Sequence, residues 1–256
     1  MKKILAMLLA LAMASTFAAC GNDTDDGEDT SADTTVAEDT TAEDTTVAED
    51  ETDAAVMSYA DYVAAELESE VVIEAYVQAK QSWWDNKATI YTQDEDGAYF
   101  IYEMACSEED YAKLVPGTKI KVTGYKTAWE GEVEIASGAT FEIIEADPYI
   151  AEAIDLTDKL GTDELINYQN QFAAFKGMTV EAVEYKNGEP GDDVYLTLGY
   201  GDASYSFCLE IYLTGADTEV YQTVGTLEVG DVVDVEAFVY WYQGANPHVV
   251  SITVAE

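Results

Sequence analysis

Val115 to Gly131 reads VPGTKIKVTGYKTAWEG, and Glu228 to Gly244 reads EVGDVVDVEAFVYWYQG. A constant shift of 113 positions superposes the two stretches. Each begins with a turn, continues as a strand in which apolar and polar residues alternate, and ends in an aromatic-rich loop closed by glycine. Such alternation is typical of a half-buried β-strand. The chain is therefore predicted to use one small β domain twice.

The shift pairs glycine with glycine and apolar or aromatic residues with residues of the same kind. A second similarity, at a shift of 107 positions, matches residues 73–75 with residues 180–182. Because the shift grows from 107 to 113, the second copy has six more residues between its first and fourth strands. The matched positions are Gly117 with Gly230, Ile120 with Val233, Val122 with Val235, Tyr125 with Phe238, Trp129 with Tyr242, and Gly131 with Gly244.

Turn and capping signals divide each copy into elements. Ser58 and Ser107 each start a capping box, so a short helix is expected after each. Asp96-Gly97 is the expected turn of a hairpin. In the first copy the predicted strands are residues 71–80, 88–93, 98–104, 118–125 and 132–145, the last with a bend at 137–138. In the second copy a strand follows Gly177, and strands at 193–198, 204–213, 232–240 and 248–255 follow it, with helices starting at 162 and at 217.

Strand–strand–strand–helix–strand–strand, twice, resembles the OB-fold, a five-stranded partly open barrel. The fold class predicted is mainly β: two tandem OB-fold-like five-stranded barrels with short helices, at residues 56–148 and 149–256, after a disordered tether. The whole resembles tandem OB-fold lipoproteins of Gram-positive bacteria. That resemblance implies a ligand face on strands two and three, between the loops after strands one and four, and it names no ligand.

The N-terminus is predicted to be a lipoprotein signal peptide, residues 1–19. Lys2 and Lys3 precede a ten-residue apolar run, too short to span a bilayer, which needs about 20 residues. Small residues then lead to Cys20, an arrangement that resembles the lipobox of bacterial lipoproteins. The resemblance implies cleavage before Cys20, acyl chains such as palmitate on it, and a membrane-anchored protein on the extracellular face.

Residues 20–55 are predicted to be the lipidated cysteine and a disordered, acidic, Thr-rich tether. The segment repeats TTVAED and related units, and residues 21–55 hold 14 carboxylates with no aromatic or basic residue. High charge with little to bury predicts disorder. A calcium loop at Asp23 to Gly27 is disfavoured because the glycine comes one position early and no Glu stands twelfth.

The rest of the chain is strongly acidic. Residues 56–256 hold 38 carboxylates against nine lysines, a formal charge of about −29, and the chain has no arginine. Nucleic-acid binding draws affinity from Lys and Arg that neutralise phosphates, so nucleic acid is predicted not to be a partner. Cations, basic peptides, glycans and neutral ligands stay open, and calcium is the one ion that the acids suggest.

The predicted ligand surface lies in the aromatic loops. Three of the four tryptophans fall in the two loops at the mouth of the first barrel, and indole faces beside carboxylates and amides suit a sugar ring. The alternative is that these aromatics cap the barrel mouths or pack one repeat on the other. The candidate ligand-binding residues are Trp83, Trp84, Asp85, Asn86, Trp129, Glu130, Tyr240, Trp241 and Tyr242.

Signs of catalysis are sparse, so the chain is predicted not to be an enzyme and to need no cofactor. His248 is the one histidine, in a predicted strand, where a structural or surface role is expected. Cys106 and Cys208 are expected to be small buried residues, with a disulfide as the alternative. The leading hypothesis is a lipid-anchored, glycan-binding surface module; the alternatives are an adaptor that binds cations or a partner protein, or an accessory protein of an envelope complex.

Overall fold

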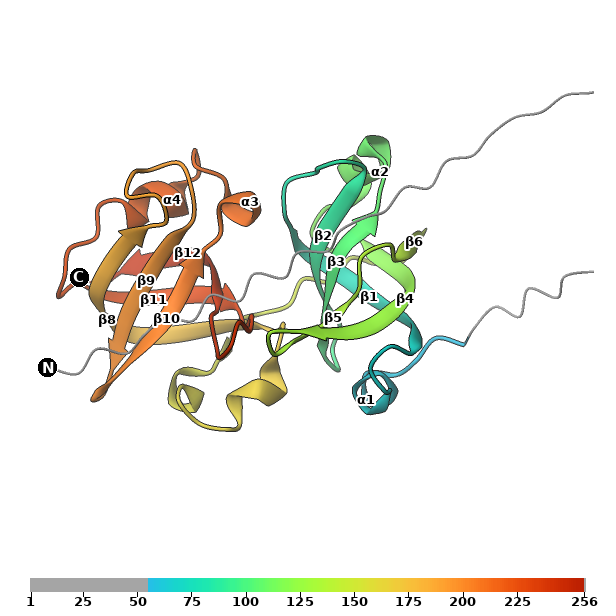
Figure 1. Ribbon diagram of the computed structural model, residues 1–256, viewed down its shortest axis with the longest axis horizontal. Helices are drawn as coiled ribbons and strands as arrows, with labels where there is room; N and C mark the ends of the chain where they lie inside the picture. Colours follow the sequence, from blue (N-terminus) through green and yellow to red (C-terminus); the bar gives the residue numbers. More distant parts are fainter. Residues whose placement is uncertain (1–54, 256) are drawn as a thin grey trace, which may run out of the picture. The chain divides into compact units, whose positions relative to one another are not determined.

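Two six-stranded sheets make up the fold (Figure 1). The computed structural model describes residues 55–255, so the predicted signal peptide, Cys20 and nearly all of the predicted tether lie outside the described residues. The strands of the first sheet are β1 (Glu70–Lys80), β2 (Lys87–Gln93), β3 (Ala98–Ala105), β4 (Lys119–Trp129), β5 (Glu132–Ile135) and β6 (Thr140–Ile144).

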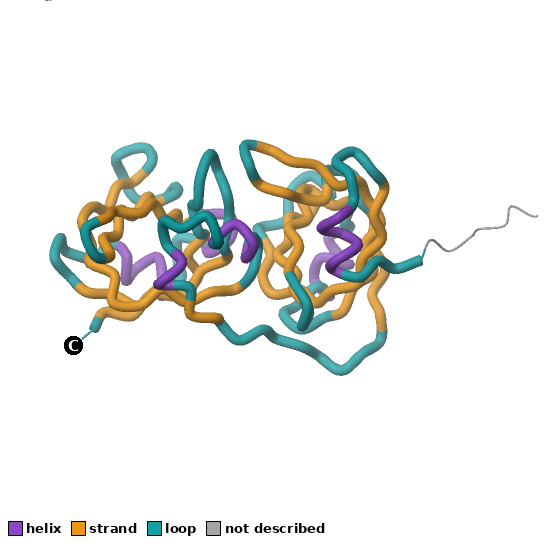
Figure 2. Tube along the Cα trace, turned by 90° about the horizontal axis from the view of Figure 1, so that it is seen from below, coloured by secondary structure: helices purple, strands orange, loops and turns teal. Residues whose placement is uncertain are grey.

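The second sheet follows after residues 145–153, which have no regular secondary structure (Figure 2). Its strands are β7 (Ile154–Asp155), β8 (Phe172–Tyr185), β9 (Val194–Tyr200), β10 (Ala203–Leu209), β11 (Val232–Phe238) and β12 (His248–Val254). The helices and 3₁₀ turns are α1 (Tyr59–Ala64), α2 (Glu108–Lys113), η1 (Thr157–Lys159), η2 (Leu165–Tyr168), α3 (Ile211–Thr214) and α4 (Glu219–Val224).

Each sheet closes on itself in OB-fold order. In the first, β1 pairs with both β2 and β4, and β2 pairs with β3. β5 closes the ring: it pairs with β3 in parallel and with β4 in antiparallel orientation. In the second, β8, β9, β10, β12 and β11 repeat that ring, again with one parallel pair. A helix separates the third and fourth strands in both. The predicted tandem five-stranded barrels are confirmed.

Local signals set most element ends. Ser58 and Ser107 cap α1 and α2 as predicted, each accepting a hydrogen bond from the backbone N–H three residues later. The Asp94 side chain accepts from two backbone N–H groups of the β2–β3 turn, at 2.8 Å each. The fifth strand is broken into β5 and β6 near Gly138, whose φ is 90°.

Three local expectations are wrong. Residues 211–214 form α3 and not the end of a strand. The long strand β8 begins before Gly177, which lies within it at a φ of 63°, and Thr218, not Asp217, caps α4.

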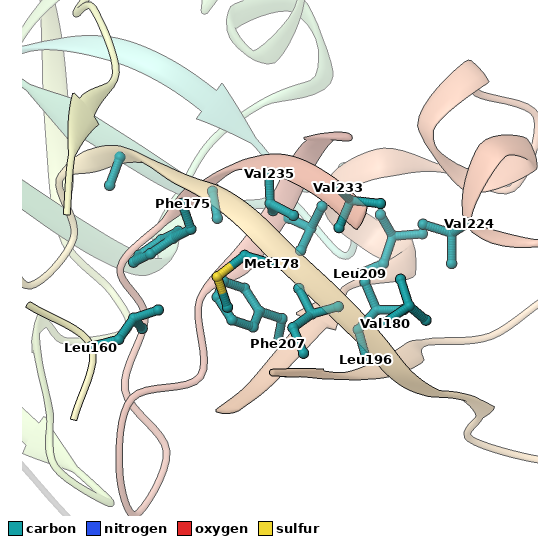
Figure 3. Packing of buried hydrophobic residues seen from close by; sticks show 14 of the residues in the cluster. Leu160, Phe175, Met178, Val180, Leu196, Phe207, Leu209, Val224, Val233 and Val235 are labelled. Atoms are coloured by element: carbon teal, nitrogen blue, oxygen red, sulfur yellow. The ribbon is translucent and has the colours of Figure 1, made fainter. Parts of the chain in front are cut away.

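Each barrel has its own apolar core. The core of the second centres on Phe175 and Phe207, whose rings meet edge to face with centroids 5.1 Å apart (Figure 3). The core of the first is built from the inward residues of β1–β4, among them Ile73 and Ile90. Alternation along the strands supplies these residues, as the sequence pattern indicated.

A third apolar cluster joins the two barrels. Tyr91 of β2 and Phe100 of β3 point outward from the first barrel, yet they are 0% and 2% exposed. Phe238 of β11 covers them: its ring stacks on Tyr91 with centroids 4.3 Å apart and planes 11° apart. The second barrel therefore covers part of the outer face of strands two and three of the first barrel.

Candidate functional site

One cavity of about 430 Å³ lies at the loop between β1 and β2. Its volume is in the range of small-molecule sites, about 300–1,000 Å³. Four aromatic side chains contribute to its wall, three from the first barrel and one from the second. The residues that line it are Gln81, Ser82, Trp83, Trp84, Lys87, Thr89, Tyr102, Glu103 and Tyr212.

A two-residue turn presents Trp84. Asp85 and Asn86 have φ values of 48° and 58°, a left-handed conformation that Asp and Asn tolerate better than most residues. The backbones of Trp84 and Lys87 bond each other across the turn, with N···O distances of 3.3 and 2.9 Å. Asp85 and Asn86, predicted as ligand contacts, thus shape the turn and do not line the cavity, while Trp84 is 76% exposed at its edge.

Trp83 is the fixed wall of the cavity. Its indole Nε1 donates to the carbonyl oxygen of Cys106 at 2.9 Å, and the side chain is half-buried. Because the hydrogen bond already holds the indole in place, its apolar face is available to a ligand without a further loss of side-chain freedom on binding.

The polar part of the wall contains one ion pair. Lys87 Nζ lies 2.8 Å from Glu103 Oε2, and Thr89 Oγ1 accepts the backbone N–H of Glu103 at 3.1 Å. The hydrogen bond from Lys87 lowers the pKa of Glu103, and Glu103 in turn raises the pKa of Lys87. The two charges offset each other, so these residues leave the cavity with hydrogen-bonding groups and no net charge.

Tyr212 reaches the cavity from α3 of the second barrel. Its carbonyl oxygen accepts from Ser82 twice, from the backbone N–H at 2.6 Å and from Oγ at 3.2 Å, and its side chain is 62% exposed. This contact could not be predicted, because the sequence pattern extends a strand through residues 211–213. Strand alternation could have placed Lys87 and Tyr102 on the outer face of the first barrel.

Trp129 and Glu130 lie elsewhere, in a contact between the repeats. The Trp129 ring packs on Tyr242 with centroids 5.2 Å apart, and Gln243 Nε2 donates to Glu130 Oε2 at 2.9 Å. Tyr242 and Gln243 are the repeat equivalents of Trp129 and Glu130 at the 113-residue shift. The fourth-strand loops of the two barrels therefore pair with each other, which is the packing alternative that the sequence left open.

Tyr240 and Trp241 also pack between the barrels. Tyr240 stacks on the His248 ring with centroids 4.2 Å apart. The backbone N–H of Trp241 donates to Glu132 Oε2 at 2.9 Å, and its indole lies against Gly131, where a Cβ would come within 2.7 Å of Cδ1. A side chain at Gly131 would collide with this indole.

Glu132 is a buried carboxyl at this contact. It is 0% exposed, its Oε1 finds no hydrogen-bond partner among residues 55–255, and burial raises its pKa to about 8. Burial likewise raises the pKa of neighbouring Glu134 to about 7. Glu132 is therefore held mainly as the neutral acid at pH 7.

His248 serves structure, as expected. Its Nδ1 lies 2.9 Å from the hydroxyl of Tyr91, and burial lowers its pKa to about 3, so the ring is neutral.

Cys106 and Cys208 are buried free thiols, as expected, and burial raises their pKa values to about 11 and about 12. Within residues 55–255, no group of three or more His, Cys, Asp or Glu side chains is placed to hold a metal ion.

No family model matches this chain, and no curated protein matches it. Among solved structures, a murine DNA binding protein bound with double-stranded DNA matches 72% of this chain and 96% of its own length, at 12% identity and a TM-score of 0.36. The Ifi202 HINa domain in complex with a 20-bp double-stranded DNA matches 73% and 100%, at 12% identity and a TM-score of 0.32.

Asparaginyl-tRNA synthetase from Pyrococcus horikoshii, complexed with asparaginyl-adenylate, is also similar, at 18% identity and a TM-score of 0.28. The match covers 34% of this chain and 19% of the synthetase, so the chain spans about a fifth of that protein's length. Likeness at this level identifies no ligand for this chain. It does correct one prediction: the exclusion of nucleic acid on charge alone was wrong, since domains similar to this chain are solved with double-stranded DNA.

Proposed function

We propose that this chain is a non-enzymatic binding module whose cavity at the β1–β2 loop takes a glycan. The observation that carries the proposal is the grouping of three exposed aromatic side chains around one cavity. Trp84, Tyr102 and Tyr212 are 76%, 40% and 62% exposed. Exposed aromatics gathered at a concave site are typical of ligand recognition.

The chemistry of the wall favours a neutral sugar ring. The C–H face of a sugar packs on indole and phenol rings, and its hydroxyls need neutral donors and acceptors nearby. Gln81, Ser82 and Thr89 line the same cavity. Because Lys87 is paired with Glu103, the cavity offers no unbalanced charge to attract an ionic ligand.

Trp84→Ala is expected to weaken glycan binding by about tenfold, taking for the sugar ring a stacking energy within the range of about 1–3 kcal/mol known for a nucleobase on an aromatic side chain. The side chain is 76% exposed, so the fold should be unaffected. The measurement is a titration of residues 56–256 with a panel of cell-wall and dietary glycans, followed by tryptophan fluorescence and by calorimetry.

The matched control is Tyr125→Ala, which removes an exposed aromatic side chain of the first barrel outside the cavity and should leave the affinity unchanged. Single-stranded and double-stranded oligonucleotides form a further arm of the titration. If oligonucleotides bind and no glycan does, the cavity is a base-stacking site and the glycan proposal is wrong. Loss of glycan binding in Tyr125→Ala but not in Trp84→Ala would place the site elsewhere.

We also propose that the module is held at the outer face of the cell membrane by lipid on Cys20. Support comes from the sequence around Cys20, which lies outside the described residues. Within residues 55–255, no helix is long and apolar enough to cross a membrane. Cells expressing the full chain and fed labelled palmitate should incorporate label, and Cys20→Ser should abolish incorporation; equal labelling of the variant would refute the anchor.

A further inference from the structure

The second barrel covers part of the face on which an OB-fold ordinarily holds its ligand. That face is the outer surface of strands two and three. Here Tyr91 and Phe100 on that surface are 0% and 2% exposed beneath Phe238 of the second barrel. The part that stays open lies next to the β1–β2 loop, where Lys87 of β2 and Tyr102 of β3 line the cavity, and the second barrel supplies Tyr212 to the same cavity.

We infer that the glycan site is composite: it is complete only while the second barrel is docked on the first, so that ligand binding and docking favour each other. The inference rests on the proposed function of the cavity. Tyr212 is the contribution of the second barrel, and its ring is the fourth aromatic of the wall.

The short helix that carries Tyr212 is fixed to its own barrel at its N-terminal end. Glu210 Oε1 accepts the Tyr212 N–H at 3.2 Å, and Asp193 Oδ1 accepts the N–H of Ile211 at 3.0 Å. The Leu213 N–H donates to the Glu210 carbonyl at 3.1 Å. The ring position therefore follows the position of the second barrel.

The same residue also holds the loop of the first barrel. The Tyr212 carbonyl accepts both the backbone N–H and the Oγ hydroxyl of Ser82, the residue before Trp83. Separation of the barrels would remove the Tyr212 ring from the cavity and release the loop that carries both tryptophans. A ligand that contacts both sides must bind the docked state more tightly, and by linkage it must stabilise docking by the same factor.

The first test compares three variants in the glycan titration. Tyr212→Ala should weaken binding by about tenfold, whereas Tyr212→Phe, which keeps the ring and the carbonyl, should stay within about twofold of the original chain. Tyr125→Ala removes a tyrosine of similar exposure, 55%, from the first barrel outside the cavity and should change nothing. Equal affinity of Tyr212→Ala and the original chain would overturn the composite site.

The second test needs no variant. Amide hydrogen exchange of residues 56–256 is measured with and without saturating glycan. Docking that is coupled to binding should raise protection at the remote contact between the fourth-strand loops, residues 129–134 and 239–246, which do not line the cavity. Protection confined to residues 81–89 would refute the coupling. If the original chain binds no glycan at all, the proposed function itself fails, which is a different result from either of these.

Discussion

Phe238→Ala is expected to lower the free energy of unfolding by about 3–5 kcal/mol, the cost of truncating a buried phenylalanine. The ring is 3% exposed and contacts Tyr91 and Phe172, with centroids 4.3 and 5.3 Å away. Its loss leaves a cavity between the barrels and not inside either of them. Unfolding in urea, followed by circular dichroism and tryptophan fluorescence, should therefore also lose cooperativity, because each barrel keeps its own core.

The chain contains a matched control for this variant. Tyr125 is the repeat equivalent of Phe238 at the 113-residue shift, but it is 55% exposed. Tyr125→Ala should change the free energy of unfolding by no more than about 0.5 kcal/mol. If the two variants lose equal stability, or if Phe238→Ala still unfolds in one step with unchanged midpoint, the contact between the barrels contributes little.

The same pair shows what the sequence could and could not predict. Alternation placed Tyr125 and Phe238 on equivalent strands, and it correctly indicated two barrels because each barrel is closed by its own local pattern. Alternation separates the two faces of a strand but does not say what covers the outer face. The burial of Phe238 and the exposure of Tyr125 depend on how two barrels meet, which no periodicity encodes.

The candidate site divides in the same way. Trp83 and Trp84 could be predicted because they follow the first strand directly, and the structure brings both into one cavity. Trp129 was grouped with them by position in the fold, yet it packs on its own repeat equivalent, Tyr242. Tyr212 was missed because the short helix α3, four residues long, is too brief for periodicity to distinguish it from a strand end.

Buried ionisable groups give the stability of the chain a predictable pH dependence. Glu132 has a pKa of about 8 in the folded chain against an ordinary value of 4.5, so the folded state retains a proton that the unfolded state releases. That contribution is complete below about pH 4.5 and is lost as the pH rises through about 8. Glu134 and Glu210, with pKa values raised to about 7 by burial, act in the same direction.

His248 acts in the opposite direction. Burial lowers its pKa from 6.5 to about 3, so the neutral ring stabilises the fold above about pH 6.5, and this contribution is lost as the pH falls toward 3. Between pH 4.5 and 6.5 the loss at three carboxyls outweighs the gain at one histidine, so stability should be greatest near pH 4–4.5 and should decline on both sides. Melting temperatures measured from pH 3 to pH 9 test this; a maximum above pH 7 would contradict the assignment.

Glu132→Gln should remove most of the alkaline decline and make the chain more stable than the original at pH 8.5, by about 1–3 kcal/mol. In the original chain, deprotonation leaves a buried carboxylate whose Oε1 has no partner in the described part of the chain. An amide has the same shape and no charge, and its carbonyl oxygen can still accept the Trp241 N–H that Glu132 Oε2 accepts at 2.9 Å.

The measurement is the urea midpoint of unfolding at pH 5.5 and at pH 8.5. The control is Glu142→Gln, which changes an exposed carboxylate of β6. If Glu132→Gln lowers the midpoint equally at both pH values, Glu132 works as a carboxylate acceptor, and protonation does not control the contact between the barrels.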